Sequence, residues 1–185
     1  MKIIPTEIND VKIIEPDIFE DERGIFFESF NKKQLKEKVD LKKENINFVQ
    51  DNHSLSKKNV LRGLHYQVNP AAQCKLVRVV SGAIYDVAVD IRESSPTFGS
   101  WVGINLDSIK NRQLWIPCGF AHGFVSLEDD TIINYKTNCF YNKFCDRSIL
   151  WNDEILDIKW PIKNDPLISN KDKNASKFLE AEFFK

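Results

Sequence analysis

The sequence of 185 residues lacks any apolar run approaching the ~18 residues that a membrane-spanning helix requires. Its amino terminus, MKIIPTEIND, has no long apolar segment of the kind found in a secretory signal peptide. An excess of charge of one sign is also missing, because 26 lysines and arginines balance 27 aspartates and glutamates. These absences argue against a membrane protein, a secreted protein, and a protein that binds nucleic acid through its overall charge.

Cysteine, glycine and proline are all sparse. The four cysteines, Cys74, Cys118, Cys139 and Cys145, form no C-x-x-C motif, so no zinc ribbon or finger is indicated. We interpret them as reduced, small hydrophobic residues of a cytoplasmic protein. Glycine and proline number seven each, too few for a collagen-like or low-complexity chain. With 42% hydrophobic residues, the composition predicts a single folded domain over residues 1–185.

Short segments rich in β-branched and aromatic residues dominate from about residue 48 to residue 151, and turn residues separate them. This spacing predicts an all-β sandwich or barrel core, preceded by short N-terminal strands. The predicted strands are Val11–Ile14, Ile25–Ser29, Val60–Leu61, Lys75–Val80, Ala83–Ile91, Ser100–Leu106, Arg112–Ile116, Gly123–Leu127 and Thr131–Thr137.

Helix is predicted in only two places. The charged segment Asn31–Glu44 begins with a weak capping box formed by Asn31 and Gln34. The tail from Pro161 is rich in Lys, Asn and Asp, with one helical stretch near Ala175–Phe183. We interpret this tail as a surface segment without a core of its own.

One predicted strand carries an unusual pattern. The alternation in AIYDVAVDI places Tyr85, Val87 and Val89 on one face of the strand. The opposite face then carries Asp86 and Asp90 on either side of Ala88. Two carboxylates on one face of a strand are unusual for a core.

Several catalytic signatures are absent. The three histidines form no H-x-H pair, which disfavours a cupin-type metal site and a metal-dependent oxygenase. The sequence contains no P-loop, no G-x-G-x-x-G fingerprint and no G-x-S-x-G nucleophile elbow. What remains is proton transfer without a cofactor, for which histidine is the natural general base near neutral pH. Arg23, Arg62 and Lys75 are cations suited to a phosphorylated or enolate ligand.

A set of motifs distributed in order over nearly the whole chain resembles the dTDP-4-dehydrorhamnose 3,5-epimerases, the cupin-type nucleotide-sugar epimerases. The matching stretches are Phe19–Phe30, Phe48–Ser54, Val60–Gln67, Gln73–Arg78, Asp86–Arg92, Ser95–Gly99, Gln113–Phe124, Tyr135–Thr137, Ile149–Asp153 and Ser169–Asp172.

The resemblance implies a mainly β fold, a cupin-like double-stranded jelly-roll barrel with short peripheral helices. It also implies a homodimer, and an isomerase that needs no cofactor and no metal. The implied reaction inverts C3 and C5 of dTDP-4-dehydro-6-deoxy-D-glucose to give dTDP-4-dehydro-L-rhamnose, in dTDP-L-rhamnose biosynthesis. Both carbons lie α to the C4 ketone, so their protons become acidic when the enolate is stabilised.

The resemblance also implies roles for individual residues. His65 matches the general base, and Asp172 matches the carboxylate that orients its imidazole. Tyr135 matches the acid that returns a proton to the opposite face, and Lys75 the cation beside the enolate oxygen. The family's substrate-binding positions correspond to Arg23, Glu28, Gln50, Asn52, Arg62, His122, Asp146 and Lys171. The Arg23–Glu28 segment is expected to reach the neighbouring subunit.

Alternative readings stay open beside this one. A relative could invert C3 only, or act on another nucleotide-linked 4-keto sugar, because the walls of the sugar pocket decide that choice. A non-catalytic cupin binding module would lack the base or the acid, whereas the sequence has His65, Tyr135, Lys75 and Asp172.

Overall fold

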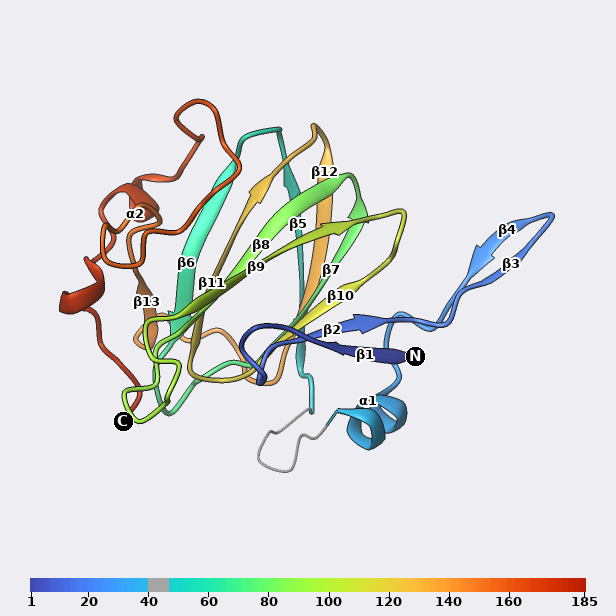
Figure 1. Ribbon diagram of the computed structural model, residues 1–185, viewed down its shortest axis with the longest axis horizontal. Helices are drawn as coiled ribbons and strands as arrows, with labels where there is room; N and C mark the ends of the chain where they lie inside the picture. The colour runs from blue at the N-terminus through green and yellow to red at the C-terminus, as the bar shows by residue number, and fades with distance from the viewer. Residues whose placement is uncertain (40–46) are drawn as a thin grey trace.

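The computed structural model describes residues 1–39 and 47–185, which form mainly β structure (Figure 1). The strands are β1 (Lys2–Pro5), β2 (Lys12–Glu15), β3 (Phe19–Asp21), β4 (Gly24–Phe26), β5 (Gln50–Ser56), β6 (Leu61–Gln67), β7 (Lys75–Ser81), β8 (Ala83–Asp90), β9 (Trp101–Asp107), β10 (Gln113–Ile116), β11 (Phe120–Ser126), β12 (Thr131–Thr137) and β13 (Asp146–Ser148). The helices are α1 (Lys32–Lys38), α2 (Asn170–Lys173) and the 3₁₀ turn η1 (Phe178–Glu180).

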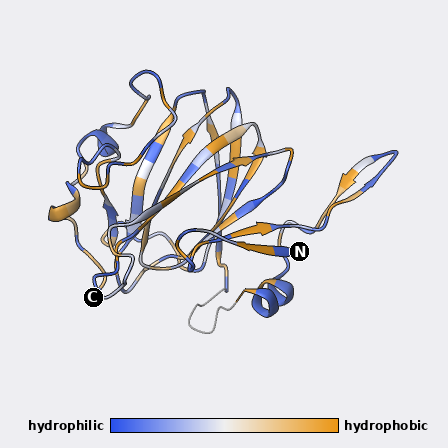
Figure 2. Cartoon of the chain, viewed as in Figure 1, coloured by the Kyte–Doolittle hydropathy of each residue, from blue (hydrophilic) through white to orange (hydrophobic). Residues whose placement is uncertain are grey.

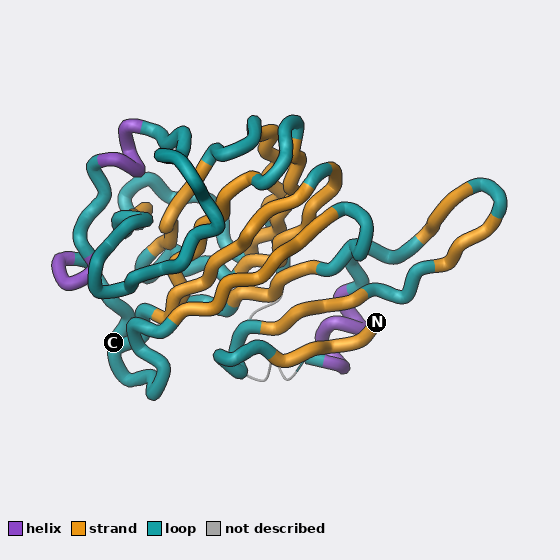
Figure 3. Tube along the Cα trace, turned by 45° about the horizontal axis from the view of Figure 1, so that its top comes forward, coloured by secondary structure: helices purple, strands orange, loops and turns teal. Residues whose placement is uncertain are grey.

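Two antiparallel sheets face each other and enclose the centre of the protein (Figures 1 and 3). The six-stranded sheet has the order β1-β2-β10-β7-β12-β5, and the five-stranded sheet has the order β13-β6-β11-β8-β9. The chain crosses repeatedly from one sheet to the other, so strands that are neighbours in a sheet are distant in sequence. This is the mainly β, cupin-like barrel that the sequence predicted.

The period-two alternation of the strands divides the core into layers. On β8, Ala88 joins the apolar cluster between the sheets, whereas Val87 and Val89 join a second cluster on the outer face of the five-stranded sheet. The alternation predicted for this strand is therefore confirmed. Figure 2 shows the same mixture of apolar and polar positions along the strands.

The C-terminal segment is not the surface tail that the sequence predicted. Phe178 is buried and packs with Trp160 on the outer face of the five-stranded sheet. Helix is also far shorter than the predicted Ala175–Phe183, because only η1 is helical there. Aromatic residues spaced along this polar segment cover the outer face of the five-stranded sheet. The residues that they contact are distant in sequence, so the local pattern does not reveal them.

The N-terminal region forms a projecting hairpin and a short helix. Strands β3 and β4 pair as a hairpin that extends away from the barrel (Figures 1 and 3). Asn31 caps α1 by accepting a hydrogen bond from the Gln34 N–H, which is one half of the predicted capping box. The Gln34 side chain donates to Glu28 instead of returning to the Asn31 backbone, and Leu35 is the buried residue of the helix. The helix ends at Lys38, and residues 40–44 of the predicted helix lie outside the described residues.

A β-bulge between β6 and β11 aims two side chains into the same space. Three residue steps from Arg62 to His65 on β6 match only two steps, from Phe124 to His122, on β11. The extra residue resets the alternation, so residues three positions apart can face the same side. Gly63 makes this possible, because its φ is +132° and a Cβ there would lie 2.5 Å from the Cα of Gly123.

Candidate active site

A cavity of about 900 Å³ lies between the two sheets and contains all four residues predicted to be catalytic. His65 comes from β6 in the five-stranded sheet, whereas Lys75 and Tyr135 come from β7 and β12 in the six-stranded sheet. Asp172 comes from α2, more than one hundred residues after His65 in the chain. The fold thus places a candidate base and a candidate acid on opposing walls.

His65 is held by Asp172. The His65 Nε2 atom lies 2.6 Å from Asp172 Oδ1, and the histidine side chain is one-third exposed while the aspartate is buried. Because a carboxylate only accepts hydrogen bonds, we assign the ring proton to Nε2, which leaves Nδ1 unprotonated. Ser169 Oγ accepts a hydrogen bond from the Asp172 N–H at 3.1 Å and fixes the start of α2.

Hydrogen bonds keep Asp172 ionised despite its burial. Desolvation raises the pKa of the carboxyl, but hydrogen bonds from His65, Ser169 and the Gly63 backbone lower it, and the net shift is downward. An ionised Asp172 stabilises the imidazolium that forms when His65 accepts a proton. This pair therefore has the chemistry of an oriented general base.

Lys75 is a buried cation with two protein acceptors. Its Nζ donates to the backbone oxygen of His65 at 3.2 Å and lies 3.5 Å from Nδ1 of His122. Desolvation lowers the pKa of Lys75 to about 8, while the charges of Asp86 and Asp146 oppose that shift. An ammonium has three donors, so one hydrogen remains for a bound oxygen atom.

Tyr135 faces the cavity from the wall opposite His65. It pairs in register with Asn52 on β5 and Val77 on β7. Desolvation raises the pKa of Tyr135, so the phenol is neutral at physiological pH and carries a proton that it can donate. The next residue, Lys136, points to the outer face of the sheet, where its Nζ lies 2.8 Å from Asp51 Oδ1.

Polar and cationic groups occupy the more exposed part of the cavity wall. Arg62 Nε donates to Ser56 Oγ at 3.2 Å and its Nη2 to the Leu55 backbone oxygen at 3.4 Å, and the guanidinium has further N–H donors for an anion. Lys171 forms an ion pair of 2.5 Å with Asp146, which also accepts a hydrogen bond from the Tyr141 hydroxyl. A diphosphate placed here would lie within reach of two cations.

Most predicted substrate-binding residues lie at the cavity. Asn52, Arg62, His122, Asp146 and Lys171 line it. Gln50 is attached to its edge, because Gln50 Nε2 donates to Asn52 Oδ1 at 2.8 Å.

The two predicted binding residues of the hairpin region lie elsewhere. Arg23 pairs with Asp21 at the tip of the β3–β4 hairpin, and Glu28 accepts hydrogen bonds from Asn31 and Gln34. Within this chain, neither residue contributes to the cavity wall.

Sequence reasoning missed the role of Asp86. Its Oδ1 lies 2.5 Å from His122 Nε2, which forms a second His–Asp pair. Of this pair, His122 lines the cavity and Asp86 lies behind it. The alternation of carboxylates around Ala88 was a signal of this site, but the partner histidine lies 36 residues away on β11. Only the strand pairing of β8 with β11 brings them together.

The described residues offer neither a metal-binding cluster nor a membrane-spanning helix. No group of three or more His, Cys, Asp or Glu residues is arranged to hold a metal ion within residues 1–39 and 47–185. In the same part of the chain, no helix has the length and apolar character needed to cross a bilayer.

Known proteins of one family resemble this chain over most of its length. A sequence model of the dTDP-4-dehydrorhamnose 3,5-epimerase family matches residues 5–180. A dTDP-4-dehydrorhamnose 3,5-epimerase of Shigella flexneri is 59% identical over 184 residues, covering 100% of this chain and 99% of the relative. The 3,5-epimerase of Pseudomonas aeruginosa is 48% identical over 184 residues, covering 100% and 99%.

Two solved structures are similarly close. An epimerase of Legionella pneumophila, in complex with dTDP-4-keto-L-rhamnose, has a TM-score of 0.89 and 48% identity, covering 95% of this chain and 92% of that one. A 3′-monoepimerase of Streptomyces bikiniensis, in complex with dTDP-quinovose, has a TM-score of 0.86 and 33% identity, covering 94% and 86%. With a histidine oriented by an aspartate, a buried lysine and a neutral tyrosine in one barrel, and with this degree of similarity over its length, the chain belongs to the dTDP-4-dehydrorhamnose 3,5-epimerase family.

Proposed function

We propose that this protein inverts C3 and C5 of dTDP-4-dehydro-6-deoxy-D-glucose and so produces dTDP-4-dehydro-L-rhamnose. The observation that carries the proposal is the placement of His65 and Tyr135 on opposing sheets, with Lys75 lining the same cavity. Inversion requires that a proton leave one face of the sugar and return to the other. Two proton carriers on opposite walls meet that requirement.

The proposed reaction starts at His65. Its unprotonated Nδ1 removes a proton from the carbon next to the ketone, and the electron pair of the C–H bond becomes part of an enolate. The Lys75 ammonium donates a hydrogen bond to the oxygen on which the negative charge develops. Asp172 stabilises the imidazolium for as long as the proton stays on His65.

Tyr135 completes each inversion. Its phenolic hydrogen is transferred to the same carbon from the opposite face, and the enolate collapses to the ketone. The tyrosinate then recovers a proton from solvent, and the His65 imidazolium releases its proton to solvent, so both groups return to their starting states. The raised pKa of Tyr135 supports this role, because the resting group is protonated. The same residues serve C3 and C5 in turn, since both carbons flank the same ketone.

The nucleotide is proposed to lie toward the exposed part of the cavity. Arg62 and Lys171 are cations suited to the diphosphate, and Asn52 and Gln50 supply amide groups for neutral polar atoms. A cytoplasmic location is also proposed. No disulfide joins the four cysteines, and disulfides are rare in that reducing compartment.

The experiment that tests the reaction is NMR of dTDP-4-dehydro-6-deoxy-D-glucose mixed with the protein in deuterated water. Deuterium is expected at both C3 and C5, and the His65→Ala variant is the matched control for non-enzymatic exchange. Label at C3 alone would support a C3-only epimerase, a second candidate favoured by the similarity to the S. bikiniensis 3′-monoepimerase. No label at either carbon would overturn the epimerase proposal for this substrate.

A homodimer is the proposed working form, with the Arg23–Glu28 segment reaching the neighbouring subunit. The β3–β4 hairpin supports this, because Phe19 and Phe26 are 63% and 69% exposed on a projecting arm (Figure 3). Apolar side chains on such an arm favour burial against another surface. The side chain of Arg23 is 86% exposed at the tip and would be available to a ligand held by the partner.

Light scattering of the Phe19→Ser/Phe26→Ser double variant tests the dimer. Loss of the dimer is expected, with weaker substrate binding. Phe144→Ser is the matched control, because Phe144 is 88% exposed and lies outside the hairpin. A wild-type protein that is monomeric at all concentrations would contradict the proposal.

A further inference from the structure

We propose that Asp86 is a positioning residue that acts through His122 to aim the Lys75 ammonium at the ketone oxygen of the substrate. This inference rests on the proposed function. The structural basis is a chain of contacts from β8 through β11 to β7. Asp86 Oδ1 lies 2.5 Å from His122 Nε2, and His122 Nδ1 lies 3.5 Å from Lys75 Nζ.

The first step of the argument is the position of Asp86. Its side chain is fully buried, and the cavity is lined by His122 instead. Asp86 therefore cannot act on a bound sugar directly. Any effect of its charge on the reaction passes through the groups that stand between it and the cavity.

The second step is the tautomer of His122. A carboxylate accepts hydrogen bonds and does not donate them, so Asp86 requires the ring proton on Nε2. Desolvation lowers the pKa of His122, with the Asp86 charge opposing that shift, so the ring is neutral near pH 7. Nδ1 is then an acceptor, and it faces the ammonium of Lys75, which can only donate.

The third step is the orientation of Lys75. One ammonium hydrogen goes to the His65 backbone oxygen, at 3.2 Å, and a second to His122 Nδ1. The third hydrogen is directed by the other two, because the ammonium is tetrahedral. With the opposite tautomer, His122 would present an N–H to Lys75, and the cation would lose that anchor.

The charges around Lys75 determine the pH at which its ammonium loses a proton. Asp86 on β8 and Asp146 on β13 favour the charged ammonium, while Lys171 on α2 disfavours it. Its Nζ also contacts the backbone oxygen of His65 on β6 and the ring Nδ1 of His122 on β11. Asp86 is the largest of the influences that favour the charged form, so its removal lowers the pKa of Lys75 below about 8.

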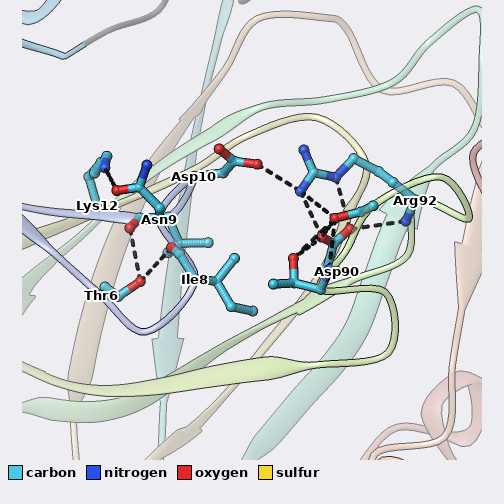
Figure 4. Close-up of polar contacts among 10 residues, drawn as sticks. Thr6, Ile8, Asn9, Asp10, Lys12, Asp90 and Arg92 are labelled. Carbon is cyan, nitrogen blue, oxygen red and sulfur yellow. Dashed lines mark hydrogen bonds and ion pairs between the residues drawn. The ribbon is translucent and has the colours of Figure 1, made fainter.

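A comparison with Asp90 argues against a purely structural role for Asp86. Both residues are fully buried on the same strand, but Asp90 receives hydrogen bonds from Arg92, Ser95 and Thr97. Figure 4 shows the contact between Asp90 and Arg92. Among the described residues, Asp86 Oδ2 has no hydrogen-bond partner. A buried carboxylate with an unpaired oxygen is costly to fold, which is the expected signature of a group kept for function.

The test compares Asp86→Asn with the matched control Asp90→Asn, using turnover measured from about pH 6 to pH 9.5. We expect Asp86→Asn to lower kcat roughly tenfold to a hundredfold, as carboxylates that orient a functional histidine do. The loss should grow with pH, because Lys75 loses its proton earlier. Asp90→Asn should lower the melting temperature and leave the shape of the pH profile unchanged. A loss that is equal at every pH, or no loss, would overturn the proposal.

A second measurement does not depend on activity or on substitution of Asp86. ¹⁵N NMR of the histidine rings in the wild-type protein should show His122 with its proton on Nε2, the signal being assigned with His53→Gln and His65→Asn. A proton on Nδ1 would overturn the inference even if the enzyme is active. A wild-type protein without epimerase activity would instead refute the proposed function.

Discussion

Two His–Asp pairs at the cavity wall are built alike and exposed differently. In His65–Asp172 the histidine side chain is 33% exposed, and in His122–Asp86 it is 7% exposed. Both aspartates bond Nε2, so both rings present Nδ1 away from the carboxylate. What differs is what each Nδ1 meets. For His122 it is the ammonium of Lys75, whereas the Nδ1 of His65 is left for a ligand in the cavity.

The surroundings of each histidine determine which reactions its ring can take part in. A histidine that touches a ligand can accept its proton, and the adjacent carboxylate stabilises the charge that results. A sealed histidine beside a cation gains nothing from protonation, because burial and the lysine charge both lower its pKa. We therefore propose that the same pair of residue types serves as a base in one place and as a scaffold for a cation in the other.

The sharpest way to break this comparison is to remove the base. His65→Ala should lower kcat by ~10²–10⁴-fold, the usual contribution of general base catalysis. Deuterium incorporation at C3 and C5 should fall in parallel, because no proton is removed. Both are measured by NMR in deuterated water, with thermal unfolding to show that the variant is folded. Near-normal turnover would move the base to His53 or His122 and reverse the comparison.

A second prediction extends the comparison to the opposing wall. Tyr135→Phe removes only the hydroxyl, so His65 should still exchange the C5 proton with solvent while inversion is suppressed. The ratio of substrate exchange to product should rise, by roughly tenfold or more if the hydroxyl is the donor. It is measured from the wash-out of deuterium from labelled substrate beside product formation. If exchange and product fall together, Tyr135 positions the sugar and the donor is elsewhere.

The third prediction concerns the cation that the sealed pair holds. Lys75 costs stability, because its folded pKa of about 8 lies below its ordinary value of 10.5. Below pH 8 the full cost is present, and it fades as pH rises toward 10.5, where the unfolded chain also loses the proton. Lys75→Met should therefore be inactive and yet more stable at pH 7, by about 1–3 kcal/mol after the loss of two hydrogen bonds.

Denaturant unfolding at several pH values measures this effect. The advantage of Lys75→Met over the wild type should shrink between about pH 8 and pH 10.5. An advantage that does not change with pH would mean that packing, and not the buried charge, sets the difference. A destabilised variant at pH 7 would show that the contacts to His65 and His122 outweigh the desolvation of the ammonium.

Much of the strand content was predictable from local patterns. Thr131–Thr137 was predicted with the bounds observed for β12, and the two faces of β8 follow from alternation alone. Such patterns are readable because successive side chains of a strand point to opposite faces, so residues two apart share one environment. Strand β5 was missed, because three of its seven residues are exposed and its sequence QDNHSLS is polar.

The candidate site was predictable only where motifs carried it. His65, Lys75, Tyr135 and Asp172 were identified by resemblance, and the structure brings them into one cavity. Asp86 carried only a hint, because a buried carboxylate on a strand has no assigned partner until the sheet is formed.

The sequence by itself determined the strand alternation, the cap of α1 at Asn31 and the residue types available for proton transfer. These features depend on residues that are close in sequence, so the local sequence predicts them. Only the tertiary structure decided that Arg62 and His65 share one face, through the bulge at Gly63 against Gly123. It also decided that Asp172 reaches His65 across 107 residues, since pairing between distant segments is set by packing of the whole barrel.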